Sequence, residues 1–320
     1  MTDCADFARE HLATLPTPLH PAPRLSERVG IEIWFKRDDL TGLGLGGNKV
    51  RGLEFLLADA LAQGCDHLVT AGGPQSNWAM LAAVAARTRG MPSTLVSFGD
   101  PPAGGAVGNH ALALLAGARL HFTGDPDRTS ADRGVDKVCR QLREEGLTPY
   151  GVHRGGATGL GALGYVHATA ELEAQVRNAG VRPRQLWLAT GSCGTQAGLV
   201  AGRAWLQAEH DVVGVTVSRP APECRERVHR IASEACGLLG ISARPLQVEV
   251  IDGFLGPAKG ARSTAGEIAA ELVARTEGVF LDPVFAAKAM AGLLAAAAEG
   301  AVEGPVVFRV SGGAPTLFTV

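Results

Sequence analysis

Hydrophobic and polar positions follow two alternating patterns along almost the whole chain. Short apolar, β-branched runs predict strands at residues 31–35, 67–71, 94–98, 119–122, 185–189, 212–217, 248–251 and 306–310. Between them apolar residues recur at helical spacing, as do Val50, Leu53 and Leu57 before the glycine at Gly64. Such alternation predicts an α/β fold with mostly parallel sheets, and 320 residues are enough for two domains.

Composition narrows the function classes. The chain is 46% hydrophobic and 19% charged, and its formal net charge of -2 favours neither nucleic acid nor an anionic membrane as partner. The longest apolar stretch, 290–298, is far shorter than the roughly 20 residues of a membrane span. The N-terminus lacks a secretory signal pattern, and six cysteines without a Cys-x-x-Cys pair indicate free thiols. We therefore expect a soluble cytoplasmic protein.

The segment Leu45-Gly46-Gly47-Asn48-Lys49-Val50-Arg51 carries the first candidate chemistry. It places Lys49 at the start of a predicted helix, where outward-pointing N–H groups and the helix dipole disfavour a second positive charge. That setting lowers the pKa of an amine and frees its lone pair for a Schiff base with an aldehyde cofactor. A solvated surface lysine is the alternative.

Three loops follow predicted strands, where ligand sites of α/β sheets gather. In residues 71–77, Ser76 and Asn77 either cradle a carboxylate or simply cap the next helix. Residues 190–195 combine glycines with Ser and Thr hydroxyls at a helix start, which suits a monophosphate cofactor better than a nucleotide, or form a plain turn. The third loop, residues 311–315, follows the predicted strand 306–310, and its Ser311 hydroxyl either hydrogen-bonds to a ring nitrogen or closes a turn.

Other kinds of site find little support. The nine histidines lack metal-binding spacing, and no Gly-x-Ser-x-Gly elbow occurs, so we expect neither a metal centre nor a serine hydrolase. The charged run Lys36-Arg37-Asp38-Asp39 is interpreted as a solvated strand end.

Taken together, the lysine and the loops resemble the pyridoxal-phosphate enzymes of the tryptophan-synthase β-like fold (fold type II). More narrowly, they resemble the 1-aminocyclopropane-1-carboxylate deaminase/D-cysteine desulfhydrase family. The resemblance extends over nearly the whole chain through segments 15–19, 36–40, 46–49, 53–55, 75–77, 161–165, 191–198, 281–284 and 312–315. It implies pyridoxal 5'-phosphate as cofactor, a homodimer, and mostly parallel sheets with helices on both faces. It also implies a large domain (1–49 and 161–320) and a small closing domain (50–160).

The resemblance also implies roles for single residues. Lys49 would be the Schiff-base lysine and the proton-transfer base. Ser76 would act in catalysis and, with Asn77, hold the substrate carboxylate, while Asn77 would also contact the cofactor. Ser311 would face the pyridine nitrogen. The cofactor phosphate would be held by Gly191, Ser192, Cys193, Gly194 and Thr195.

The implied activity is β-elimination from a β-substituted amino acid, as in D-cysteine desulfhydrase, giving a keto acid and ammonia. A β-replacing synthase of the same fold and a catalytically silent relative that binds cofactor or amino acid are the alternatives.

Several positions depart from the pattern of the family. Trp78 replaces a usual His or Gln, and Phe254 and Phe285 replace tyrosines. Ala286 stands where the cyclopropane deaminases place Glu, and Gly52 where a basic residue is usual. The lost phenols argue against opening of a cyclopropane ring. We expect Trp78, Phe254 and Phe285 to line the substrate site and to favour a larger or less polar side chain.

Overall fold

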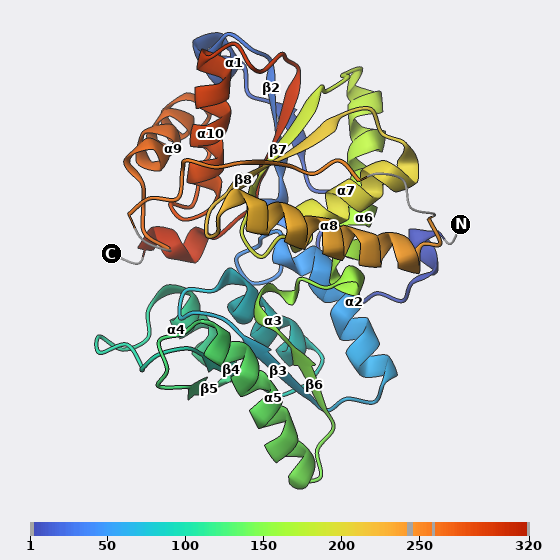
Figure 1. Ribbon diagram of the computed structural model, residues 1–320, viewed down its shortest axis with the longest axis vertical. Helices are drawn as coiled ribbons and strands as arrows, with labels where there is room; N and C mark the ends of the chain where they lie inside the picture. The colour runs from blue at the N-terminus through green and yellow to red at the C-terminus, as the bar shows by residue number, and fades with distance from the viewer. Residues whose placement is uncertain (1–2, 242–245, 258–259, 319–320) are drawn as a thin grey trace.

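The computed structural model describes residues 3–241, 246–257 and 260–318, and the chain forms two sheets, each flanked by helices (Figure 1). The large sheet has the strand order β1-β2-β10-β7-β8-β9. All its neighbouring pairs are parallel except β1 with β2. Its strands are β1 (Leu19–Pro21), β2 (Ile33–Arg37), β7 (Gln185–Thr190), β8 (Asp211–Thr216), β9 (Glu249–Ile251) and β10 (Val306–Val310).

The small sheet lies below the large one in Figure 1 and is parallel throughout, in the order β5-β4-β3-β6. Its strands are β3 (His67–Ala71), β4 (Ser93–Ser97), β5 (Arg119–Phe122) and β6 (Pro149–Val152). We call residues 67–152, which carry this sheet, the small half, and the residues around the large sheet the large half.

Most of the helices connect parallel strands of one sheet, and helices cover both faces of each sheet. They are α1 (Pro23–Val29), α2 (Lys49–Ala62), α3 (Asn77–Thr88), α4 (Gly108–Leu115), α5 (Thr129–Glu144), α6 (Gly159–Ala179), α7 (Gly194–Leu206), α8 (Ala221–Leu238), α9 (Thr264–Glu277) and α10 (Ala286–Ala298). Short 3-10 turns are η1 (Cys4–Asp6), η2 (Asp38–Leu40), η3 (Arg154–Gly156) and η4 (Ala314–Phe318).

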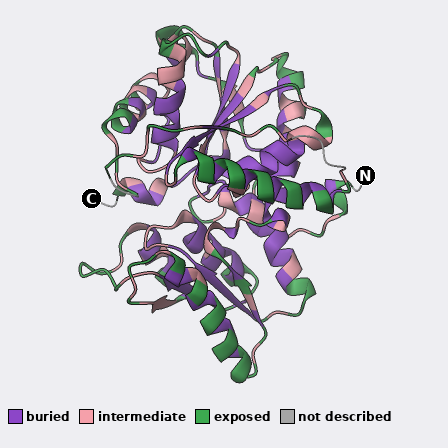
Figure 2. Ribbon diagram, in the orientation of Figure 1, coloured by how far each residue is buried: buried purple, intermediate pink, exposed green. Residues whose placement is uncertain are grey.

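The core lies on both faces of the sheets (Figure 2). In β7, Leu186 and Leu188 pack with α6, α7 and α8, while Trp187 between them packs with α9 and α10. This alternation follows from the strand period of two, because successive side chains point to opposite faces. The expected α/β architecture with helices on both faces is confirmed.

All eight predicted strands are present within two residues of their expected bounds, and three have those bounds unchanged. The structure adds β1 and β6, which the pattern did not indicate. β1 has only three residues and ends at Pro21, and β6 contains Pro149 and Gly151. Both strands lie at a sheet edge, which is where proline is tolerated in sheets.

Helix α2 leads from the large half toward the small sheet and packs closely on α6. A β-carbon at Gly52 would lie 2.8 Å from the carbonyl oxygen of Gly161, and one at Gly164 would overlap the backbone of Arg51. Position 52 is therefore filled by helix packing, and a basic side chain would not fit between these backbones.

The prediction of a solvated strand end at residues 36–39 is wrong for two of its four residues. Lys36 and Asp38 are fully buried, while Arg37 and Asp39 pair with each other and are half-buried. Asp38 accepts hydrogen bonds from Arg51, Arg309 and Tyr165, and Glu171 pairs with both Lys36 and Arg51.

These buried charges compensate one another. Burial alone would raise the pKa of Asp38, but the guanidiniums of Arg309 and Arg51 hold it well below its usual range. Burial lowers the pKa of Lys36 to about 8, partly opposed by Glu171. Because Arg51 lies on α2, Asp38 on η2 and Arg309 on β10, the cluster fixes the first turn of α2 to the large sheet.

Candidate active site

The predicted lysine lies where α2 meets the glycine loop between β7 and α7. Lys49, a half-buried residue, is the first residue of α2, and its amine donates to Ser192 Oγ over 3.3 Å. Burial lowers its pKa to about 8, and Cys193 opposes the shift only in part. The direction agrees with the prediction, but the main cause is loss of hydration. At pH 7 roughly a tenth of the amine is therefore unprotonated, compared with well under a thousandth at its ordinary pKa.

Asn48 joins three segments of the site and was not singled out from the sequence. Its side-chain Nδ2 donates to Thr195 Oγ1 over 3.1 Å, and its backbone N–H donates to the Ser311 carbonyl over 2.8 Å. Asn48 is buried. Asn48 belongs to the Gly-Gly-Asn-Lys segment that drew attention to Lys49, but its position next to the lysine does not predict that it bridges other segments.

The glycine loop has the geometry of an anion cradle. Helix α7 begins at Gly194, and Cys193 before it has a left-handed backbone with φ of 76°. The first N–H groups of a helix have no intrahelical partner, so those at Gly194 and Thr195 are free to bind an anion. Gly194 also permits close approach of Ala157, since an added β-carbon would lie 3.2 Å from its Cα.

Ser311 provides a test of whether pyridoxal phosphate fits this site. It follows β10, and its hydroxyl is buried without a hydrogen-bond partner within the described residues. Such a group costs free energy unless a ligand satisfies it. Pyridoxal phosphate needs a group for its ring nitrogen, an amine and an anion cradle, and Ser311, Lys49 and the glycine loop would supply these three contacts. The residues present fit it.

Ser76 and Asn77 lie at the start of α3. Ser76 Oγ accepts from the backbone N–H of Ala79 over 3.1 Å, so it does cap the helix. Asn109, another residue that sequence reasoning missed, donates from Nδ2 to Asn77 Oδ1 over 2.6 Å. This contact directs the Asn77 Nδ2 donor toward Gly313, where an added β-carbon would lie 2.8 Å from it. Asn77 and the Ser311 loop are therefore neighbours.

The three aromatic positions do not gather in one place. The Phe285 ring lies beside the glycine loop, 3.7 Å from an added β-carbon at Gly191. Phe254 packs against α10, near Gly292. Trp78 is buried in the core of the small half, and its Nε1 donates to Thr70 Oγ1 over 2.8 Å. Its contacts are those of a packing residue, so its expected place on a substrate wall gains no support.

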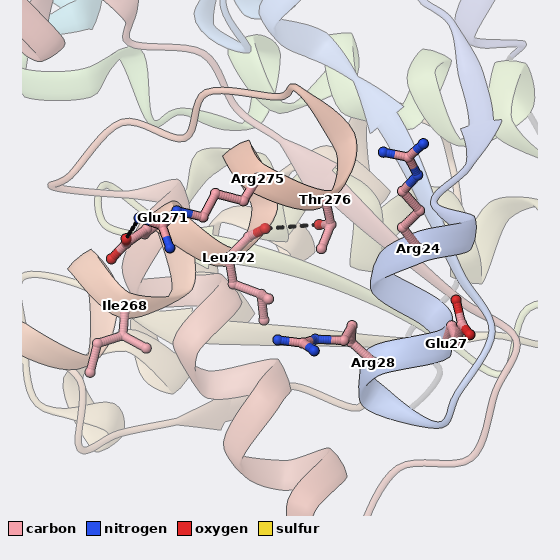
Figure 3. A pocket seen from close by; sticks show the side chains of 8 residues that line it. All are labelled: Arg24, Glu27, Arg28, Ile268, Glu271, Leu272, Arg275 and Thr276. Carbon is pink, nitrogen blue, oxygen red and sulfur yellow. Dashed lines mark hydrogen bonds and ion pairs between the residues drawn. The ribbon is translucent and has the colours of Figure 1, made fainter.

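A surface groove of about 580 Å³ between α1 and α9 lies elsewhere on the large half (Figure 3). Its lining includes Arg24, Arg28, Ile268 and Leu272. None of the predicted site residues borders it, so the site is defined by the converging loops and not by this hollow. The described residues contain no cluster of three or more metal-ligating side chains. Nor do they contain a helix long and apolar enough to cross a membrane.

The fold and the lysine site define a pyridoxal-phosphate enzyme, and comparison with known proteins agrees. The family description "Pyridoxal-phosphate dependent enzyme" matches residues 11–312. The D-cysteine desulfhydrase of Yersinia enterocolitica is 40% identical over 98% of this chain and 96% of its own. A Pyrococcus abyssi protein provisionally named 1-aminocyclopropane-1-carboxylate deaminase is 38% identical over 98% of this chain and 93% of its own.

Solved structures give the same picture. A 1-aminocyclopropane-1-carboxylate deaminase homologue superposes with a TM-score of 0.92 at 33% identity, covering 98% of this chain and 94% of that one. Threonine deaminase isoform 2 from Solanum lycopersicum shares the fold at a TM-score of 0.68 and 17% identity, covering 94% of this chain and 80% of that one. The chain belongs to the pyridoxal-phosphate-dependent enzyme family. The resemblance, the fold type, the cofactor and the prediction of an enzyme are confirmed.

Proposed function

We propose that this enzyme is a lyase that eliminates the β-substituent of an amino acid and yields a keto acid and ammonia. The observation that carries the proposal is the Lys49 amine. Its pKa is lowered to about 8, and it lies 3.3 Å from Ser192 Oγ on the cofactor-phosphate loop. The relatives named D-cysteine desulfhydrase support the same reaction class.

The roles of the residues follow from their contacts. Pyridoxal phosphate, when bound, supplies the electron sink for the reaction. Lys49 takes the α-proton, and general-base catalysis of this kind contributes about 10²–10⁴-fold. Ser76 and Asn77 hold the substrate carboxylate, with Asn77 kept in orientation by Asn109. The glycine loop, residues 191–195, holds the phosphate through backbone N–H and hydroxyl groups.

Ser311 and the phenylalanines direct the outcome. The Ser311 hydroxyl is neutral, so it would not keep the ring nitrogen of a bound cofactor protonated, and loss of a β-substituent would then be the favoured outcome. Phe254 and Phe285 carry no proton-donating group, and we therefore propose that the enzyme does not open cyclopropane rings. A substrate with a larger or less polar side chain than cysteine suits these rings. Turnover of D-cysteine as efficient as that of every bulkier β-substituted amino acid would contradict this preference.

The proposal extends to assembly and location. We propose that residues 50–160 form a small domain that closes over residues 1–49 and 161–320. The two separate sheets and the placement of Lys49 at the start of the connecting helix support it. We further propose a homodimer in the cytoplasm.

The decisive experiment compares the wild-type protein with Lys49→Ala. Visible absorption is recorded with added pyridoxal phosphate, before and after addition of D- and L-amino acids, and keto acid is measured in parallel. We expect a cofactor band that requires Lys49, shifts with one enantiomer series, and accompanies release of keto acid. A band that no amino acid disturbs would indicate a silent binding protein, and substituted amino acids in place of keto acid would indicate a synthase.

A further inference from the structure

Four arginines lie close to one another beside the glycine loop, residues 191–195. Arg128 directly precedes α5 and Arg154 belongs to η3, both in or beside the small half. Arg219 follows β8 and Arg227 lies on α8, both in the large half. We call these four residues the junction arginines; all are half-buried. None of them was a predicted site residue.

Two of the junction arginines are fixed to the glycine loop by hydrogen bonds. Arg227 Nε donates to the Ser192 carbonyl over 3.1 Å, and Arg219 Nη1 donates to the Gly191 carbonyl over 3.4 Å. They therefore hold the carbonyl side of the loop, whereas an anion at the start of α7 is held by N–H groups. The cluster is thus separate from the cradle for the cofactor phosphate, although only Ser192 separates Arg227 from the Lys49 amine.

Carboxylates neutralise only part of this charge. Asp132 pairs with Arg154 at 2.7 Å, and Glu223 pairs with Arg219 at 2.9 Å. Among the described residues, neither Arg128 nor Arg227 has an ion pair. The Arg128 guanidinium lies 5.9 Å from the Phe98 ring centroid, and its Nε is buried and has no hydrogen-bond partner in the part of the chain that the structure describes.

The neighbouring arginines make the charged forms of Arg128 and Arg227 less favourable. Burial lowers the pKa of Arg128, and Arg154 and Arg219 lower it further. Burial likewise lowers the pKa of Arg227, with Arg219 the next contributor. Like charges fixed side by side and partly desolvated are unfavourable unless a negative group joins them. Guanidinium forks match the geometry of phosphate, sulfonate and carboxylate oxygens.

We propose that the junction arginines form an anion subsite that binds one oxyanion group between the two halves of the molecule. Two sources share this chemistry: an anionic β-substituent of the substrate, and a free inorganic oxyanion. The first source rests on the proposed lyase function, and the second does not. In either case the bound anion draws Arg128 and Arg154 toward Arg219 and Arg227, and so favours approach of the two halves.

The test uses the cofactor-loaded protein, in which the cofactor phosphate already occupies the glycine loop. Inorganic phosphate is titrated by calorimetry into the wild type, Arg128→Gln, Arg227→Gln and the control Arg140→Gln, which alters an exposed arginine of α5. Loss of one charged hydrogen-bond donor should weaken phosphate binding about tenfold or more. Arg140→Gln should bind as the wild type does. Arg128→Lys, which keeps the charge but not the fork, should fall between them and guards against a folding defect.

A kinetic arm identifies the source of the anion. The ratio of kcat/KM for O-phosphoserine to that for β-chloroalanine, in both enantiomers, should fall about tenfold in Arg128→Gln if the anion belongs to the substrate. An unchanged ratio with weakened phosphate binding assigns the subsite to a free anion. If the wild type turns over neither amino acid, the proposed function fails while the phosphate titration still decides the subsite.

Two results would overturn the proposal. The first result has two parts. The wild type shows no saturable phosphate binding, or all variants bind phosphate equally well, and the kcat/KM ratio of the two substrates is also unchanged in Arg128→Gln. The other is a loss of pyridoxal phosphate affinity in Arg128→Gln and Arg227→Gln that fully accounts for the other effects, since the cluster would then serve the cofactor phosphate.

Discussion

Replacement of Lys49 by methionine should stabilise the cofactor-free protein at neutral pH. Methionine keeps the apolar stem and removes the ammonium group, which the fold desolvates. The pKa of Lys49 falls from 10.5 to about 8, mainly through burial. At about 1.4 kcal/mol for each tenfold change in proton affinity, this corresponds to a penalty of about 3 kcal/mol for the charged form. Loss of the hydrogen bond to Ser192 costs about 1 kcal/mol, so the net gain in the free energy of unfolding is about 2 kcal/mol.

The pH dependence gives this prediction its sharpest test. Between pH 8 and 10.5 the unfolded chain still holds the Lys49 proton and the folded chain does not, so the contribution of this group to wild-type stability rises with pH. Below pH 8 both states are protonated and the penalty is constant. The advantage of Lys49→Met should therefore be constant up to about pH 8 and shrink above it. Toward pH 10.5 only the lost hydrogen bond to Ser192 remains, which favours the wild type by about 1 kcal/mol.

Urea unfolding of the cofactor-free proteins at pH 7, 8, 9 and 10 measures the difference between wild type and Lys49→Met. Lys137→Met, an exposed lysine on α5, is the matched control and should change stability by less than about 0.5 kcal/mol at every pH. A Lys49→Met protein less stable than the wild type at pH 7, or an advantage that persists unchanged at pH 10, would refute the reasoning that the amine is held in a costly, desolvated state.

Three further substitutions test the frame of the site. Asn48→Ala should weaken pyridoxal phosphate binding about tenfold in a visible absorbance titration, because the lysine helix loses its hydrogen bond to the phosphate loop; unchanged affinity would contradict this. Gly52→Ala should lower the free energy of unfolding by about 1–3 kcal/mol, since its β-carbon would lie 2.8 Å from the Gly161 carbonyl oxygen, and an unchanged Tm would count against the packing account. Asp38→Asn should cost about 3–5 kcal/mol in urea unfolding because it leaves Arg309 uncompensated, and a loss below about 1 kcal/mol would show that the buried charges are neutralised in another way.

The parts of the fold that could be predicted are those where one physical signal dominates. The strand His67–Ala71 is buried on both faces and appears in the sequence as a short apolar run, and its bounds were predicted without error. β6 gives no such signal because Pro149 and Gly151 interrupt it, and it pairs only because β3 offers an open edge. Pairing of that kind is a tertiary effect that no local pattern contains.

The site divides in the same way. Lys49, Ser76 and the glycine loop could be proposed as site residues from the sequence because each combines a reactive or phosphate-binding residue type with a strand-to-helix turn. Asn48 and Asn109 could not, since their roles depend on which distant groups the fold brings within hydrogen-bond distance. Trp78 shows the converse case, in which a residue beside the site in sequence turns into the core of the small half.

The charged run at residues 36–39 explains why polarity alone misleads at such positions. A buried ion is rare without partners, so each of these residues by itself is expected at the surface. The partners of Lys36 and Asp38 come from α2, α6 and β10, between 13 and 271 residues further along the chain, and only the assembled fold brings them together. Because the buried cluster includes Arg51, two residues after Lys49, its charges also fix the backbone that presents the amine. Desolvating the Lys49 amine costs stability, and contacts at the start of α2 offset this cost. These contacts are the Arg51–Asp38 hydrogen bond, the Asn48–Thr195 hydrogen bond and the close packing of Gly52 on α6.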